Sequence, residues 1–161
     1  MSSVWRIATD APGYTADDLA GAGAKQSGGR WNRPGNAMLY CASNISLAVL
    51  ETFIHLKAGG LPLNRYLVEL KIPDAVWARA TLRDAPPVGW DAIPTGKVSL
   101  DEGDRWLKAN YSALLIVPSV IVSEERNVLI NPLHPDAQQI KARKVRKWAY
   151  DPRLMRTDSR R

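Results

Sequence analysis

The sequence has few residues that form covalent or metal cross-links. Its 161 residues include one cysteine, Cys41, and two histidines. A single cysteine excludes a disulfide within the chain, and such a small set of soft ligands argues against a structural zinc site. We therefore expect no metal, and a core built from the apolar residues, which make up 45% of the chain.

Long apolar runs are also absent. No stretch approaches the roughly 18 consecutive apolar residues that a membrane-spanning helix needs, and the first residues, Met-Ser-Ser-Val-Trp-Arg, lack the apolar region of a secretory signal. These features predict a cytoplasmic protein with no membrane partner. The length is typical of one domain, so we expect residues 1–161 to form a single domain.

Several sequence motifs of common enzyme classes are missing. Gly21-Ala-Gly23 lacks the third glycine of a dinucleotide-binding fingerprint, and the chain contains no Gly-x-x-x-x-Gly-Lys and no His-Glu-x-x-His. Ser119 is not part of a Gly-x-Ser-x-Gly nucleophile turn. The sequence therefore argues against a Rossmann domain, a P-loop NTPase, a zinc protease and an α/β-hydrolase.

Acidic residues are scarce only at the C-terminal end. The net charge is +6, yet residues 141–161 hold nine Lys and Arg against two Asp, whereas residues 1–140 hold 13 basic and 14 acidic side chains. A basic end of this kind is either solvated or docks an acidic partner or a polyanion. No nucleic-acid recognition motif accompanies the charge, although Trp148 and Tyr150 keep a non-enzymatic nucleic-acid-binding module open as an alternative.

Apolar periodicity and turn residues predict a mixture of strands and helices. The expected strands are 4–8, 37–42, 65–72, 76–82, 113–117 and 143–150, and the expected helices are 17–24, 45–57 and 100–110. Ser43 or Asn44 is a suitable N-cap for the second helix, and Gly59-Gly60 is a suitable end. There is no regular βαβ repeat, so we predict an α+β fold with mixed or antiparallel sheets and flanking helices.

Three polar side chains between residues 27 and 56 are poorly explained by structure alone. Arg30 follows two glycines, Tyr40 ends an apolar run, and Glu51 lies in an otherwise apolar helix. Ordinary roles exist for each of them: a surface arginine, a core tyrosine and an i,i+4 contact from Glu51 to His55. Together, a guanidinium, an aromatic ring and a semi-buried carboxylate favour a substrate that carries phosphate and a ring.

The order of several short segments resembles the RES-domain family, which is named for its Arg, Glu and Ser. The segments are Trp5-Arg6, Gly28-Gly29-Arg30-Trp31-Asn32, Leu39-Tyr40, Leu50-Glu51, Ile54-His55-Leu56, Pro118-Ser119 and the Asn-Pro-x-His-Pro stretch that begins at Asn131. The resemblance covers nearly the whole chain. It implies a fold similar to the ADP-ribosyltransferase toxins, and a bacterial toxin whose partner is an antitoxin with an Xre-type helix-turn-helix domain.

The same resemblance implies an activity on NAD, which is the substrate. Members of the family consume NAD by phosphorolysis or hydrolysis, or transfer ADP-ribose to a protein, and the sequence does not separate these outcomes. DNA would be contacted only through the antitoxin. An activity on NAD agrees with the carboxylate noted above, because cleavage of the nicotinamide–ribose bond passes through an oxocarbenium-like state that a carboxylate stabilises.

Site residues follow from the resemblance position by position. The implied catalytic residues are Arg30, Tyr40, Glu51 and Ser119, with Arg30 on the pyrophosphate, Tyr40 and Ser119 near the nicotinamide end, and Glu51 beside the reacting carbon. Asn131 and Arg6 are further candidates for NAD binding. The leaving nicotinamide is already cationic, so no general acid is expected.

Overall fold

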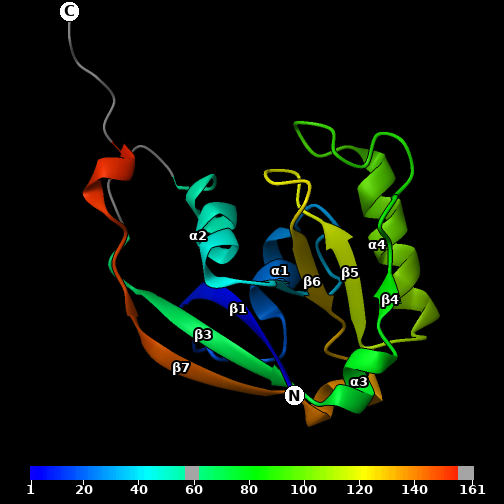
Figure 1. Cartoon of the computed structure of the whole chain (residues 1–161), viewed down its shortest axis with the longest axis horizontal. Helices are drawn as coiled ribbons and strands as arrows, with labels where there is room; N and C mark the ends of the chain where they lie inside the picture. The colour runs from blue at the N-terminus through cyan, green and yellow to red at the C-terminus, as the bar shows by residue number, and fades with distance from the viewer. Residues whose placement is uncertain (57–61, 156–161) are drawn as a thin grey trace, which may run out of the picture.

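The computed structural model describes residues 1–56 and 62–155 (Figure 1). Seven strands, four α-helices and two short 3-10 helices make up this part of the chain. In chain order they are β1 (Ser2–Thr9), α1 (Ala22–Ser27), β2 (Leu39–Ala42), α2 (Ile45–Phe53), β3 (Arg65–Ile72), α3 (Asp74–Ala78), β4 (Thr81–Leu82), α4 (Lys97–Ala109), β5 (Leu114–Pro118), β6 (Arg126–Ile130), η1 (Pro135–Gln139), β7 (Lys141–Trp148) and η2 (Pro152–Met155).

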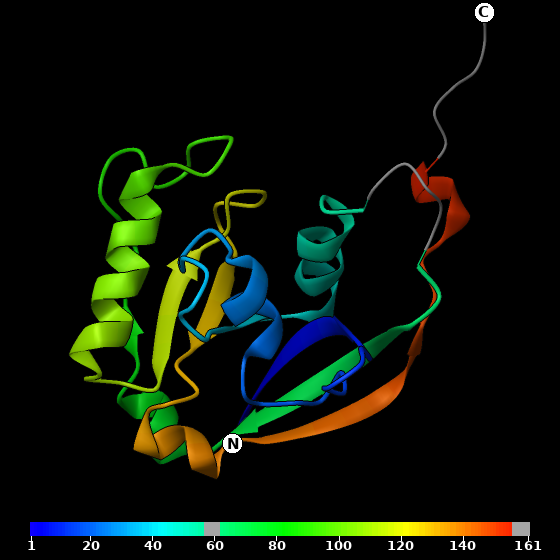
Figure 2. The same ribbon diagram turned by 180° about the vertical axis from the view of Figure 1, so that it is seen from behind.

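All seven strands belong to one mixed sheet in the order β4-β5-β6-β2-β1-β3-β7. The pair β4–β5 is parallel and the other neighbouring pairs are antiparallel. Helices flank this sheet, as Figures 1 and 2 show. The predicted α+β class with a mixed sheet and flanking helices is confirmed.

The sheet is narrowest at the junction of β1 and β2. Eight residue pairs join β1 to β3, from Ser2↔Ile72 to Thr9↔Arg65. In contrast, the register of β1 with β2 contains a single pair, Trp5↔Ala42. Beyond that pair the two strands separate, and in Figures 1 and 2 β1, β3 and β7 run across the direction of β5 and β6. The separation leaves room for a cavity inside the sheet.

The core spans this junction, because one cluster of buried residues joins Val4 of β1 to Leu39 of β2 and Val128 of β6. Leu47 and Ala48 of α2 pack with Ile7 of β1 and Leu67 of β3. Trp106 of α4 packs in a separate cluster with residues of β5 and β6. Burial of large apolar side chains of this kind contributes roughly 1.5–3 kcal/mol each. Both helices are therefore fixed on the sheet by their apolar faces.

One glycine determines how closely α4 approaches the site. A Cβ atom at Gly103 would collide with the carbonyl group of Trp31. Trp31 is itself buried in the cluster that holds Trp106. Because glycine has no side chain, the helix can lie directly on the backbone of the loop that carries Arg30.

Most predicted elements are confirmed, with shifted ends. The strand over 65–72 has the predicted bounds, and Asn44 is the N-cap of α2, where its side chain accepts a hydrogen bond from the Leu47 N–H at 2.8 Å. Helix α2 ends at Phe53 rather than at residue 57. The Gly59-Gly60 end that the sequence suggested lies outside the described residues.

Two predicted elements are wrong. Residues 76–82 do not form one strand, because helix α3 begins at Asp74 after the N-cap Pro73, and only Thr81–Leu82 pair with β5. The helix expected over 17–24 lies instead at Ala22–Ser27. Gly21 precedes it with φ of 69°, and the space beside its Cα is filled by the backbone of Met38. A side chain there would collide, so this tertiary contact fixes the helix start.

Helix α4 begins three residues earlier than the predicted start at residue 100. The helix begins at Lys97, so Asp101, Glu102 and Asp104 lie further along it and form ion pairs. Part of the basic C-terminal segment also has a definite place. Residues Lys141–Trp148 form the edge strand β7, in which Arg143 pairs with Glu69 at 2.7 Å.

Candidate active site

A cavity of about 960 Å³ lies where β1 and β2 separate. Its walls include residues 5–9 of β1 and 38–42 at β2, together with residues of α2, the loop over 27–31 and the loop over 93–95. Its volume is at the upper end of the roughly 300–1,000 Å³ range of ligand pockets. Arg6, Arg30, Tyr40 and Glu51, four of the predicted site residues, all line it.

Glu51 projects from α2 and has one oxygen fixed by two donors. Its Oε1 accepts hydrogen bonds from Ser119 Oγ at 2.7 Å and from Asn127 Nδ2 at 2.7 Å. Among residues 1–56 and 62–155 no donor to Oε2 is found, and no ion pair joins Glu51 to His55. Residues at β5 and β6 therefore hold one oxygen of a carboxylate that lines the cavity, and the i,i+4 contact weighed from sequence does not form.

Ser119 positions Glu51 and does not line the cavity. Its side chain is fully buried at the end of β5. Its oxygen accepts the N–H groups of Ile121 at 3.1 Å and Val122 at 3.2 Å, and its hydroxyl proton goes to Glu51. Because a serine hydroxyl has one proton, this geometry leaves no donor for nicotinamide or ribose.

The Tyr40 hydroxyl is also used within the protein. It donates to Asn32 Oδ1 at 2.6 Å and accepts the Trp31 N–H at 3.0 Å. Burial raises the pKa of Tyr40 far above its ordinary value, so the phenol stays neutral. Its hydroxyl group lies against Gly29, where a Cβ atom would be 2.6 Å away. Tyr40 thus offers its ring to the cavity and fixes the glycine-containing turn with its hydroxyl.

Arg30 is attached to the loop that follows β4. Its Nη1 donates to the carbonyl oxygens of Trp90 at 3.0 Å and Ala92 at 2.9 Å. Trp90 also stacks on Trp31, with ring centroids 5.8 Å apart. The two carbonyl contacts use only Nη1, so Nε and Nη2 remain the donors with which Arg30 can bind an anion.

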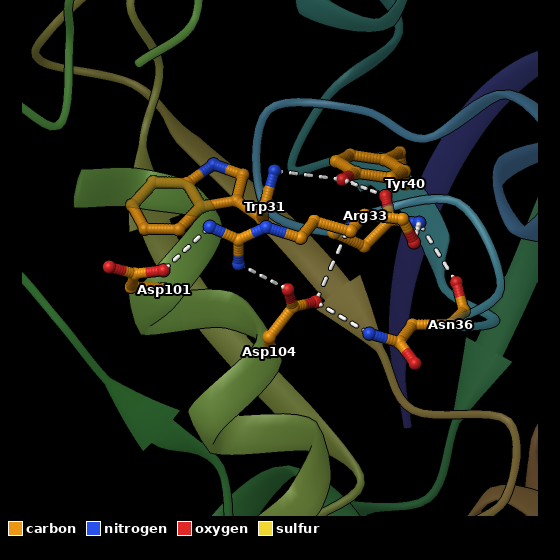
Figure 3. A network of polar contacts seen from close by, with 7 residues as sticks. Trp31, Arg33, Asn36, Tyr40, Asp101 and Asp104 are labelled. Atoms are coloured by element: carbon orange, nitrogen blue, oxygen red, sulfur yellow. Dashed lines mark hydrogen bonds and ion pairs between the residues drawn. The ribbon is translucent and has the colours of Figure 1, made fainter. Parts of the chain in front are cut away.

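A network of ion pairs and hydrogen bonds fixes the loop that follows Arg30 (Figure 3). The same loop contains Trp31 and Asn32, the two hydrogen-bond partners of the Tyr40 hydroxyl. Arg33 binds Asp101 through Nη2 at 2.7 Å and Asp104 through Nη1 at 2.7 Å. Asn36 Nδ2 donates to Asp104 Oδ1 at 2.9 Å. Single exposed ion pairs contribute little, but here one arginine spans two carboxylates of α4. The network therefore fastens the loop to a helix and keeps the wall of the cavity in place.

Two half-buried arginines line the cavity, and some of their buried N–H donors lack a partner. Arg6 on β1 has Nε and Nη1 buried, and Arg65 at the start of β3 has Nε buried, with no hydrogen-bond partner for these atoms in the part of the chain described. Both residues line the cavity. Because each guanidinium group carries five N–H donors, a ligand with acceptor oxygens fits this wall of the cavity.

Sequence reasoning missed Arg65 and Asn127. Arg65 is the first residue of a predicted strand, and nothing in the local pattern distinguishes it from a surface arginine. The sequence position of Asn127 could have indicated a role, because it is the polar residue directly before the apolar run of β6. In the structure it lies opposite Ala42 of β2. Its Nδ2 holds Glu51, while its Oδ1 is buried and has no partner within the described residues.

Asn131 is not brought together with the other predicted residues. It lies just beyond the opposite end of β6 and does not line the cavity. Its Nδ2 donates to Asn110 Oδ1 at 2.9 Å, and its Oδ1 accepts the Leu133 N–H at 3.1 Å. These contacts fix the chain after β6, and we leave Asn131 out of the site.

The described residues contain no group of three or more His, Cys, Asp or Glu side chains placed to hold a metal ion. None of the helices in that part of the chain is both long and apolar enough to span a bilayer.

Comparison with known proteins identifies similar sequences along almost the whole chain. The profile of the RES domain matches residues 3–153. A protein of Sphingobium sp. (strain YBL2) named "Prs ADP-ribosylating toxin" is 62% identical over 157 residues, which cover 96% of this chain and 98% of that protein. A protein of Yersinia enterocolitica named "Toxin Res" is 36% identical over 142 residues, covering 88% of this chain and 93% of that one.

A solved structure has a similar fold. It is the MbcT–MbcA toxin–antitoxin complex of M. tuberculosis, one chain of which superimposes with a TM-score of 0.59 at 16% sequence identity. The match covers 89% of this chain and 81% of that chain. At this identity the likeness concerns the fold.

Proposed function

This chain belongs to the RES-domain family, and we propose that it is the toxin of a toxin–antitoxin pair and that its cavity cleaves NAD. The observation that carries the proposal is Glu51, whose Oε1 is held by Ser119 and Asn127 while the side chain faces a cavity lined by arginines. A fixed carboxylate beside a cationic wall suits a substrate with a diphosphate and a carbon that becomes positive.

The proposed chemistry breaks the bond between C1′ of the nicotinamide ribose and the ring nitrogen. The electron pair of that bond leaves with nicotinamide, which becomes neutral, and positive charge develops at C1′ and the ring oxygen. Glu51 stabilises this charge through its free oxygen. Because nicotinamide leaves without needing a proton, the absence of an acid partner for Glu51 is consistent with the step.

The diphosphate would be bound by guanidinium groups. Arg6 and Arg65 line the cavity, and Arg30 has Nε and Nη2 free of its carbonyl contacts. Guanidinium groups bind phosphate oxygens with charge-assisted hydrogen bonds. The ring of Tyr40, which lines the cavity, would pack against the nicotinamide end.

The ADP-ribose formed in this step has three possible acceptors: water, inorganic phosphate or a protein side chain. The Sphingobium relative, which is 62% identical, is named a Prs ADP-ribosylating toxin, which favours a protein acceptor, and we propose transfer to Prs as the acceptor reaction. In the balanced reaction, NAD and a protein nucleophile give nicotinamide, the ADP-ribosylated protein and the proton that the nucleophile loses. Hydrolysis and phosphorolysis use the same first step.

We also propose that an antitoxin, of the Xre type, binds and inhibits this chain. The similar solved structure is one of a toxin–antitoxin complex, and relatives are named toxins. Contact with DNA would pass through the antitoxin. In β7, Arg143 and Lys144 are already engaged with Glu69 and Asp10, which weakens the alternative of direct nucleic-acid binding.

The test measures nicotinamide release from NAD by purified protein, with and without phosphate and with and without Prs. We compare the wild type with Glu51→Gln, and use Glu124→Gln, an exposed glutamate, as a matched control. Loss of a fixed electrostatic group should slow release about 10²–10³-fold, while the control stays at the wild-type rate.

The product identifies the acceptor. Phosphate-dependent release indicates phosphorolysis, release in buffer alone indicates hydrolysis, and radiolabel on Prs indicates transfer. Folded wild-type protein that releases no nicotinamide under any of these conditions refutes the proposal, as does a Glu51→Gln variant that works at the wild-type rate.

A further inference from the structure

We propose that three isoleucines around the mouth of the cavity form the docking surface for the protein that accepts ADP-ribose. We call Ile54, Ile93 and Ile121 the isoleucine collar. The inference rests on the proposed function and adds to it the surface that selects a protein acceptor. NAD binding alone does not require this surface.

The three collar residues come from separate parts of the chain. Ile54 follows the end of α2, Ile93 lies in the loop before α4, and Ile121 lies in the loop between β5 and β6. All three line the cavity, and their exposed fractions are 56%, 83% and 37%. In Figure 1 these segments, the cyan helix end, the green loop and the yellow loop, lie on the same side of the molecule.

The polar parts of NAD do not account for an exposed apolar collar. Its diphosphate and riboses are polar and need donors, which the arginines that line the cavity supply. Exposed apolar side chains gathered at one place are typical of a surface that binds another protein. A protein nucleophile that attacks C1′ beside Glu51 must also enter this cavity, so the acceptor has to pass the collar.

The collar is held by the same residues that form the site. The backbone next to Ile93 is fixed by Arg30, through the carbonyls of Trp90 and Ala92. The Ile121 N–H donates to Ser119 Oγ, which also holds Glu51. A preorganised surface loses little conformational entropy on binding. The collar and the carboxylate are therefore fixed relative to each other, as transfer to a docked protein requires.

The experiment separates acceptor docking from NAD cleavage. We make Ile93→Ser and Ile54→Ser, and use Leu133→Ser as the control, because Leu133 is 81% exposed and does not line the cavity. Two rates are measured for each protein: nicotinamide release without acceptor, and transfer of labelled ADP-ribose to purified Sphingobium Prs over a range of Prs concentrations.

We expect each collar variant to lose about tenfold in kcat/KM for Prs, because one buried isoleucine contributes roughly that factor to association. Nicotinamide release without acceptor should stay within about twofold of the wild type, and Leu133→Ser should match the wild type in both assays. Circular dichroism and an unchanged thermal midpoint verify that the variants fold.

Two results would overturn the inference while leaving NAD cleavage intact: collar variants that modify Prs as efficiently as the wild type, and a wild type that releases nicotinamide but labels no Prs. A wild type that releases no nicotinamide overturns the proposed function itself. Equal loss of both rates in the collar variants would assign these isoleucines to NAD binding and also contradict the docking role.

Discussion

Replacing Ser119 by alanine should separate the positioning of Glu51 from the stability of the fold. The substitution removes the 2.7 Å hydrogen bond to Glu51 Oε1 and leaves Asn127 as the remaining described donor to that oxygen. A hydrogen bond to a charged group contributes about 1.5–3 kcal/mol. If that contribution is realised in the transition state, kcat should fall by about 10- to 150-fold.

The same substitution also affects the backbone. The N–H groups of Ile121 and Val122 lose their acceptor, Ser119 Oγ. Each unsatisfied buried donor costs about 1–3 kcal/mol, and less where water replaces the lost partner. We therefore expect the free energy of unfolding to fall by about 1–3 kcal/mol, which is separate from the effect on kcat.

Ser112→Ala is the matched control. Ser112 is buried, accepts the Trp106 Nε1–H at 3.1 Å and donates to the Leu114 carbonyl at 2.9 Å, but it does not line the cavity. Its loss should lower stability by a similar amount with kcat unchanged.

The assays are nicotinamide release at saturating NAD and urea unfolding followed by tryptophan fluorescence. If Ser119→Ala and Ser112→Ala lose equal stability and equal kcat, or if folded Ser119→Ala keeps the wild-type kcat, the positioning role is refuted.

Three further predictions concern the walls of the cavity. Gly29→Ala should reduce NAD affinity at least several-fold, since the new Cβ would lie 2.6 Å from the Tyr40 hydroxyl and displace it; calorimetric titration of the protein with NAD measures the change, and unchanged affinity would contradict the contact. Asp104→Asn should lower the free energy of unfolding by about 1 kcal/mol at low salt and less at 1 M salt, because it weakens the ion pair with Arg33; an identical loss at both salt concentrations would argue against an electrostatic origin. Burial raises the pKa of Cys41 to about 11, against the opposing charge of Arg6, so the thiol contributes stability that is complete below pH 9 and is lost as pH rises to 11. Cys41→Ala should abolish about 2–3 kcal/mol of that loss in urea titrations between pH 8 and 11, and parallel curves for both proteins would contradict it.

Local patterns predicted those elements whose residues decide their own conformation. The alternation of Tyr66, Val68, Leu70 and Ile72 defined β3 with correct bounds. This alternation did not predict that Leu67, on the opposite face of the strand, is buried as well. That face is covered by α2 and Tyr150, which are distant in sequence. Apolar alternation indicates which face of a strand is buried, whereas burial of the opposite face depends on which elements pack on it in the fold.

Contacts with distant residues explain the failures. The start of α1 depends on the backbone of Met38 beside Gly21, and β4 exists only because two residues pair with β5. Strand β6 was not predicted at all from the apolar run 128–130, which is too short for periodicity to identify. In such cases the conformation is decided by tertiary pairing and not by propensity.

The candidate site was predictable where its residues are close together. Arg30, Tyr40 and Glu51 lie within one segment, and the structure places all three on one cavity. The partners of Glu51 are 68 and 76 residues away, at Ser119 and Asn127. The family resemblance predicted Ser119 as a site residue, but not that it positions Glu51. No local sequence pattern predicted that Asn127 binds the Glu51 carboxylate.

The single residue pair between β1 and β2 has a mechanical consequence. Trp5↔Ala42 is the only registered rung at this seam, whereas eight rungs join β1 to β3. Across the described sheet, very few hydrogen bonds therefore oppose a rotation of the two halves about this seam, as at a hinge, and the apolar core that spans the seam is what resists it. A ligand that contacts both Arg6 on β1 and Tyr40 on β2 would connect the two strands where paired residues are lacking, and would restrict this rotation. Its binding should slow hydrogen exchange along the inner edges of β1 and β2 more than anywhere else in the sheet.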